Sequence, residues 1–177
     1  MAQPQYCLKT RQKKVFPMTD VFPIVLAVGD KAPDFDLPRD GGGQVRLADF
    51  GGKPLVLFFY PKDDTTACTT ESISFTGLKA DFDRAGVAIL GISPDTVKSH
   101  DKFVRKYALS VPLASDEEKT MAMAYGVWRE KSMYGRTYMG VVRSTFLIGA
   151  DGRIARLWDK VKVAGHAEEV LAAAKEL

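Results

Sequence analysis

Two uninterrupted apolar runs constrain the fold of this chain more than any other feature of its sequence. They are PLVLFFY at residues 54–60 and VAILGIS at residues 87–93. Runs of this length and composition are typical of strands buried on both faces of a sheet. Between them, residues 69–84 carry apolar side chains at helical spacing, and Gly86 provides a stop signal for a helix. The order strand, helix, strand predicts a βαβ unit with two parallel strands.

Two further helices are predicted downstream. One runs from Asp95 or Thr96 to Tyr107. The other begins at Ser115, because Ser115 and Glu118 form a capping box, and Gly126 supplies a stop. In the helix at residues 69–84, the side chains predicted to face the core are Ile73, Phe75, Leu78 and Phe82. In the helix that ends at Tyr107, they are Val97, Phe103, Val104 and Tyr107.

The last third of the chain changes character. Residues 141–148 read as a strand, Asp151-Gly152 is a strong hairpin turn, and residues 154–158 form the returning strand. A final helix is predicted from Gly165 to Leu177, with Val170, Leu171 and Ala174 facing inward. A βαβ unit followed by a hairpin and a helix indicates an α/β fold, a mixed sheet flanked by helices. This order is similar to the thioredoxin arrangement, with an insertion before the hairpin.

The chain has 177 residues, which suits one domain with a real core. We expect residues 1–28 to be an N-terminal arm and residues 29–177 to be a single domain. The arm holds a basic cluster, which favours a solvated tail or a start site assigned too early, with Met18 as the true initiator. That cluster consists of Lys9, Arg11, Lys13 and Lys14.

Charge and hydropathy argue against two classes of partner. The net charge is only +3, and no basic cluster within the predicted domain suggests nucleic-acid binding. No apolar run approaches the roughly 20 residues that cross a bilayer, and no clear signal peptide precedes the domain. A cytoplasmic protein is expected.

The chain contains two cysteines, Cys7 and Cys68, and they form no CxxC pair. Its two histidines lie far apart and offer no metal-ligand spacing, so neither a metal nor another cofactor is expected. In the cytoplasm both thiols should be reduced at rest. Each cysteine is therefore judged by its surroundings.

Cys68 lies where a buried strand leads into a helix. Free backbone N–H groups and the positive end of the helix dipole meet at that point, and both stabilise a thiolate, the nucleophilic form of cysteine. The alternative is a small buried cysteine packed as a hydrophobic residue. Its polar neighbours favour the nucleophile; they are Thr65, Thr66, Thr69, Thr70 and Glu71.

The residues around Cys68 resemble a known family. Pro61-x-x-x-Thr65-x-x-Cys68 is similar to the active-site signature of the peroxiredoxins, and FFYPKDD-T-x-x-CTTE resembles their bacterioferritin comigratory protein or peroxiredoxin Q subfamily. GDKAPDFDL at 29–37 and RSTFLI at 143–148 resemble two further family segments. The resemblance implies a thiol peroxidase with a thioredoxin-like fold, acting in antioxidant defence on hydrogen peroxide or organic hydroperoxides.

The resemblance also implies roles for matching residues. Cys68 would be the peroxidatic cysteine, Thr65 would place its hydroxyl against peroxide and thiolate, and Pro61 would shield the thiolate from water. Arg143 would lie close to Cys68 and favour its thiolate. Glu71 would either orient Arg143 or complement the helix N-terminus.

The chain departs from the subfamily at two places. Thr66-Ala67 stands where members commonly have Pro-Gly, and Ile73 occupies the position of a common resolving cysteine. The Cys68 sulfenic acid is therefore expected to be resolved by an external thiol, a 1-Cys mechanism, with Cys7 as the alternative. Thioredoxin, glutaredoxin or glutathione would be the reductant, and a monomer or weak homodimer is expected.

Two other functions are alternatives for a protein with Cys68 at this position. A thioredoxin-like disulfide reductase needs CxxC, and Thr65 occupies the place of its first cysteine. A redox sensor or binding protein, in which Cys68 only registers oxidation, has no need of both Thr65 and Arg143. The combination favours turnover of peroxide.

Overall fold

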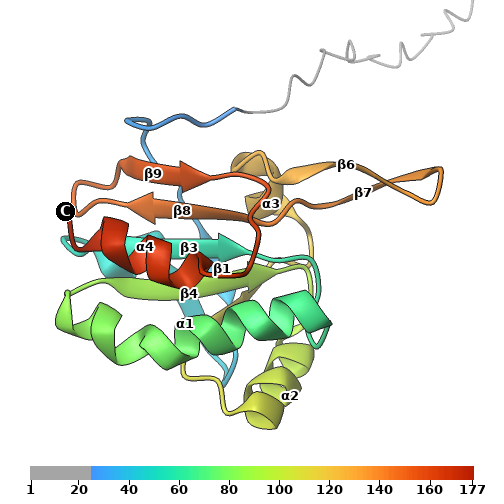
Figure 1. Ribbon diagram of the computed structural model, residues 1–177, viewed down its shortest axis with the longest axis horizontal. Coiled ribbons are helices and arrows are strands. Elements are labelled where there is room, and N and C mark those ends of the chain that lie inside the picture. The colour runs from blue at the N-terminus through green and yellow to red at the C-terminus, as the bar shows by residue number, and fades with distance from the viewer. Residues whose placement is uncertain (1–24) are drawn as a thin grey trace, which may run out of the picture.

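The computed structural model describes residues 25–177, so Cys7 and the basic cluster lie outside the described residues, and the boundary at residue 29 stays a prediction. The centre is a five-stranded sheet with the order β5-β4-β3-β8-β9 (Figure 1). β3, β4 and β5 are parallel, β8 is antiparallel to β3, and β9 is antiparallel to β8. The strands are β3 (Leu55–Phe59), β4 (Ala88–Ser93), β5 (Leu113–Ser115), β8 (Ser144–Ile148) and β9 (Ile154–Trp158). The predicted βαβ unit and the final hairpin are confirmed.

Helices cover both faces of this sheet (Figure 1). α1 (Thr66–Arg84), α2 (Val97–Tyr107) and α4 (His166–Ala174) pack on one face. α3 (Thr120–Ala124) packs on the other, together with β1 (Asp36–Pro38), β2 (Gln44–Arg46) and the 3-10 helix η1 (Leu47–Phe50). Within residues 25–177, no helix is long and apolar enough to cross a membrane. The mixed sheet with flanking helices confirms the predicted α/β class.

The central strand β3 shows why the apolar run is continuous. Successive side chains of a strand point to opposite faces, so Val56 and Phe58 pack toward α1, α2 and α4, while Leu57 and Phe59 pack toward α3. All four are fully buried. Phe58 stacks on Phe75 of α1, with ring centroids 4.6 Å apart. This packing fixes α1, and with it the helix start that carries Cys68, against the sheet.

The predicted inward face of α1 is wrong at Ile73. Phe75 and Phe82 are fully buried, whereas Ile73 is 46 % exposed. At 3.6 residues per turn, position 73 lies about 140° around the helix from Cys68 and so faces away from the sheet. On α2, Phe103 is buried as predicted, but the residue buried with it is His100 rather than Val97.

The predicted helix start at Ser115 is also wrong. Ser115 ends β5, and its hydroxyl donates to the carbonyl oxygen of Asp95 at 2.6 Å. α3 begins only at Thr120. The carboxylate of Asp116 accepts hydrogen bonds from the N–H groups of Met121 and Ala122, at 3.2 and 2.7 Å. The carboxylate therefore satisfies the amides at this helix start, the role that the sequence pattern predicts for the capping box.

Residues 141–148 form two strands rather than one. β7 (Arg136–Val141) ends before Val142, and β8 begins at Ser144. β6 (Trp128–Met133) and β7 make an additional hairpin, which projects from the body of the molecule (Figure 1) and was not predicted. At the break the N–H of Val142 donates to Val127 and the carbonyl of Arg143 accepts from Val161. Arg143 therefore lies outside the strand ladder, free to direct its side chain toward α1.

Candidate active site

The predicted site lies at the carboxyl end of β3, the edge of a sheet where ligand sites gather in α/β folds. Tyr60 still bonds to β4, its N–H donating to the carbonyl of Ile92 at 3.0 Å. The chain leaves the sheet at the half-buried Pro61 and enters α1 at Thr66. Cys68 lies in the first turn of α1 and is only 1 % exposed.

Arg143 reaches Cys68 from the break between β7 and β8. Its Nη2 donates to Cys68 Sγ at 3.1 Å, and its Nη1 forms an ion pair with Glu71 Oε2. Cys68 and Glu71 come from α1 and Arg143 from the break before β8, 72 or more positions away, yet the three form one chain of polar contacts. Of the two alternatives for Glu71, the structure shows the contact with Arg143.

The electrostatics of this triad are dominated by burial. The Glu71 side chain is 1 % exposed, and burial raises the pKa of its carboxyl from 4.5 to about 7, although Arg143 opposes the rise. For Arg143, burial works to lower the pKa, but Glu71 and Cys68 outweigh it and raise the pKa above its ordinary value. The guanidinium is therefore held as a permanent cation beside the sulfur.

Thr65 occupies the N-cap of α1 with an extended backbone, φ −89° and ψ 154°, but its side chain does not cap the helix. Its hydroxyl instead donates to the carbonyl oxygen of Lys62 at 3.0 Å. Because that proton is engaged, the oxygen presents its lone pairs as an acceptor. Within the described residues no hydrogen bond joins Thr65 to Cys68, and Thr65 is exposed.

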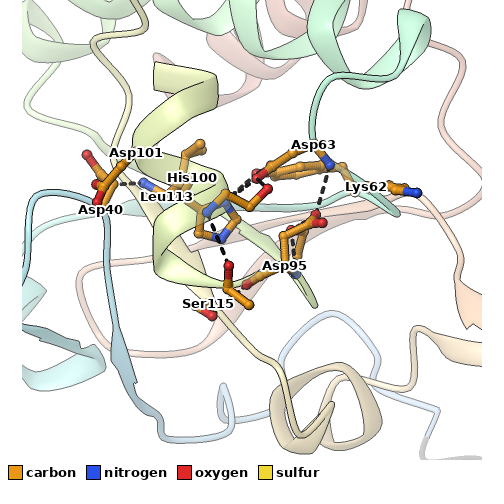
Figure 2. Close-up of polar contacts among 12 residues, drawn as sticks. Asp40, Lys62, Asp63, Asp95, His100, Asp101, Leu113 and Ser115 are labelled. Carbon is orange, nitrogen blue, oxygen red and sulfur yellow. Dashed lines mark hydrogen bonds and ion pairs between the residues drawn. The ribbon is translucent and has the colours of Figure 1, made fainter. Parts of the chain in front are cut away.

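Sequence reasoning missed a second group of polar residues beneath this loop. The Asp63 carboxylate is buried and contacts Tyr60, Ser99 and His100, while its backbone N–H donates to Asp95 (Figure 2). A usable signal was present, because Asp63 and Asp95 each follow a buried parallel strand, and such strand ends meet at one edge of the sheet.

The rest of the described surface offers no competing chemistry. No group of three or more histidine, cysteine, aspartate or glutamate side chains in residues 25–177 is arranged to hold a metal ion. A hollow of about 640 Å³ lies beside β1 and α3, but no predicted site residue lines it. The nucleophile, its cation and the helix start at Cys68 remain the arrangement able to do chemistry.

Comparison with known proteins identifies one family. A model of the AhpC/TSA family matches residues 28–157. Peroxiredoxin Bcp of Xanthomonas campestris is 49 % identical over 146 residues, covering 81 % of this chain and 91 % of that protein. Peroxiredoxin Bcp of Bacillus subtilis is 43 % identical, covering 87 % of this chain and 98 % of that protein.

Solved structures give the same result. Peroxiredoxin Q of Xanthomonas campestris superimposes with a TM-score of 0.77 at 48 % identity, covering 80 % of this chain and 90 % of that one. Both the thioredoxin-like peroxiredoxin fold and the resemblance drawn from the motifs are confirmed. The chain belongs to the AhpC/TSA family of peroxiredoxins, thiol peroxidases, and within it to the bacterioferritin comigratory protein or peroxiredoxin Q subfamily.

Proposed function

We propose that this peroxiredoxin reduces hydrogen peroxide and alkyl hydroperoxides through a sulfenic acid on Cys68, which an external thiol then resolves. The contact between Arg143 Nη2 and Cys68 Sγ, 3.1 Å long and at a helix start, carries the proposal. A guanidinium and the first-turn N–H groups both favour a thiolate over a thiol. The guanidinium and the helix start therefore lie at the sulfur, where the thiolate would need them.

In the first step the Cys68 thiolate attacks the terminal oxygen of the hydroperoxide. The S–O bond forms as the O–O bond breaks, and its electron pair leaves with the alkoxide, or with hydroxide when the substrate is hydrogen peroxide. The leaving oxygen then takes up a proton, giving an alcohol or water. Sulfur is oxidised by two electrons to the sulfenic acid.

Thr65 and Arg143 assist that step through their positions. The lone pairs of the Thr65 hydroxyl accept the hydrogen bond of the peroxide O–H, since its own proton is donated to Lys62. Arg143 supplies N–H donors for the charge that develops along the breaking O–O bond. Pro61, half-buried at the start of the loop, limits the access of water to the sulfur. Together these residues align the peroxide with the sulfur.

A relative supports the alkyl hydroperoxide part of the proposal. The bacterioferritin comigratory protein of Xanthomonas campestris, 47 % identical with a TM-score of 0.77, has been described in trapped intermediate and ligand complexes that bear on its alkyl peroxide reduction activity. The match covers 80 % of this chain and 90 % of that one. We propose that Cys68, Thr65 and Arg143 carry out the corresponding reaction in this chain.

Resolution follows in two exchanges. A first thiol condenses with the sulfenic acid, giving a mixed disulfide and water, and a second thiol releases Cys68 and leaves as the disulfide. Ile73 offers no thiol, and Cys68 is the one free cysteine among residues 25–177. Thioredoxin, glutaredoxin or glutathione is the proposed reductant.

The test is consumption of hydrogen peroxide and of cumene hydroperoxide, with dithiothreitol, the thioredoxin system or glutaredoxin with glutathione as the sole reductant. We expect sustained turnover of both peroxides with at least one protein reductant, and none with Cys68→Ser. A sulfenic acid on Cys68, trapped with dimedone after one equivalent of peroxide, should accompany turnover. Peroxide consumption by Cys68→Ser at the wild-type rate would refute the assignment.

A further inference from the structure

Asp63 and His100 form a buried polar pair, with Oδ2 and Nδ1 2.8 Å apart, that the proposed mechanism does not use. We propose that this pair is a positioning device for the peroxide site: it fixes the peptide group that orients the Thr65 hydroxyl. The inference rests on the proposed function, since it concerns the alignment of peroxide at Cys68. Asp63 and His100 are therefore positioning residues and touch no substrate.

The Asp63 carboxylate is saturated with donors. Its side chain is 4 % exposed. Oδ1 accepts from the hydroxyl of Tyr60 at 2.7 Å, and Oδ2 accepts from the hydroxyl of Ser99 at 2.7 Å and lies 2.8 Å from His100 Nδ1. Burial, and then Asp63, raise the pKa of Tyr60 well above its ordinary value, so Tyr60 keeps the proton that it donates. The carboxyl group has partners in Tyr60, directly after β3, and in α2, and it has little freedom to rotate.

His100 is held at both of its ring nitrogens. Nε2 lies 3.1 Å from the carbonyl oxygen of Ala114, which can only accept, so Nε2 donates there. Nδ1 lies 2.8 Å from Asp63 Oδ2, so the imidazole joins the Ala114 carbonyl to the Asp63 carboxyl group. The ring is fully buried and spans the gap between the loop and β5 (Figure 2).

The link to the reaction passes through one peptide group. The N–H of Asp63 donates to Asp95 Oδ2 at 2.8 Å, and the carbonyl of Lys62, in the same peptide, accepts from the Thr65 hydroxyl at 3.0 Å. Because a peptide group is planar, fixing its N–H and the adjoining side chain also fixes the direction of its carbonyl. The Thr65 hydroxyl therefore takes its orientation from the Asp63 anchor (Figure 2 shows Lys62, Asp63, Asp95 and His100).

The neighbouring carboxylate supplies a natural control. Asp64 also ties the loop to α2, accepting from Lys106 Nζ at 2.7 Å and from the Tyr107 hydroxyl at 2.6 Å. These contacts are exposed, and exposed ion pairs add little to geometry or stability. Asp64→Asn thus removes a charge from the same loop without disturbing the buried pair.

The experiment compares two reactions of Cys68 in single turnover, in a Cys7→Ser background so that one thiol is measured. Oxidation by peroxide needs an aligned substrate, whereas alkylation by iodoacetamide needs only the thiolate. We expect His100→Leu to slow peroxide oxidation about 10- to 100-fold, the scale of a 1 Å misplacement, and to change alkylation by less than about 3-fold. His100→Asn keeps a donor for Asp63 and should restore most of the peroxide rate.

Three variants separate positioning from stability. Tyr60→Phe removes one donor to Asp63 while keeping the ring, so it should slow peroxide oxidation about 10-fold even if His100→Leu does not fold. Asp64→Asn should stay within about 3-fold of wild type in both reactions. Ile89→Ala, which opens a cavity at the far end of β4, should lower thermal stability but leave both rates per folded molecule unchanged.

The positioning role would be overturned if Tyr60→Phe oxidised with peroxide at the wild-type rate. It would also be overturned if Tyr60→Phe or His100→Leu slowed peroxide oxidation and alkylation equally. A parallel loss of peroxide rate in Ile89→Ala would do the same, because stability alone would then explain it. The proposed function fails separately, if wild-type Cys68 does not react with peroxide at all while iodoacetamide still alkylates it.

Discussion

Replacing Arg143 by alanine removes two interactions at once. Its guanidinium donates to Cys68 Sγ at 3.1 Å and is also the counter-charge of the buried Glu71. Loss of one donor to developing charge typically slows a reaction by about 10²–10³, and we expect Arg143→Ala to slow peroxide reduction by that factor. The second loss, at Glu71, makes the stability of the variant depend on pH.

The size of this effect follows from the burial of Glu71, whose pKa rises from 4.5 to about 7 in the folded protein. A group with a raised pKa binds its proton more tightly when folded, so protonated Glu71 contributes stability that is present below pH 4.5 and lost as the pH rises through 7. That loss is about 3 kcal/mol in the wild type, at about 1.4 kcal/mol for each unit of pKa.

Without Arg143, the attraction that opposes the pKa rise is gone, and burial raises the pKa of Glu71 further. The loss of stability then continues above neutral pH, at up to about 1.4 kcal/mol per pH unit. Between about pH 7 and pH 8.5, Arg143→Ala should therefore lose about 1–2 kcal/mol more than the wild type.

Urea unfolding of both proteins at about pH 6, 7 and 8.5 measures this difference. The double variant Glu71→Gln, Arg143→Ala lacks the titrating group, so its free energy of unfolding should follow the wild-type slope above pH 7. If the free energies of unfolding of wild type and Arg143→Ala fell in parallel over that range, the pKa of Glu71 would not depend on Arg143, and the reasoning would be wrong.

Three further outcomes are expected. Thr65→Val should slow single-turnover peroxide oxidation of Cys68 about 10²–10³-fold without unfolding the protein, and Thr65→Ser should retain most of the rate; equal rates for both would contradict the acceptor role. Cys7→Ser should keep its peroxidase activity with dithiothreitol, whereas a quantitative Cys7–Cys68 disulfide in the wild type by mass spectrometry would overturn the 1-Cys mechanism. Excess peroxide should convert Cys68 to the sulfinic acid, while Ile73→Cys should resist this by forming a disulfide, which requires local unwinding of α1.

The parts of the fold that the sequence predicted are those where one local pattern decides the structure. The run at 54–60 is buried on both faces, and Asp151-Gly152 makes the expected turn between β8 and β9. Cys68 was located because a helix start following a buried strand can be recognised from contiguous residues. Arg143 was found only through the resemblance, since nothing in its own neighbourhood indicates that it reaches α1.

The failures occur where a distant contact decides between local alternatives. Ser115 with Glu118 is a credible helix start, but Asp116 caps α3 instead and Ser115 bonds to Asp95. Residues 141–148 look like one strand, yet the ladder breaks at Val142 and Arg143 because their backbone groups pair with residues outside it. No periodicity encodes such choices.

The same limit explains why Asp63 and His100 were missed. They lie 37 positions apart, and only the packing of α2 against the loop that follows β3 brings His100 Nδ1 within 2.8 Å of the Asp63 carboxyl group. Removing one partner of such a buried polar pair leaves the other without its hydrogen bond, so the pair tolerates few other arrangements of the loop. Glu71 and Arg143 form a second pair of this kind. In the proposed mechanism one pair directs the donor at the sulfur and the other directs the acceptor at Thr65, so the proposed peroxide site lies between two buried pairs. On this proposal, Thr66-Ala67 at the start of α1 can replace Pro-Gly without loss of an ordered site, because the geometry is imposed from α2 and from the break before β8.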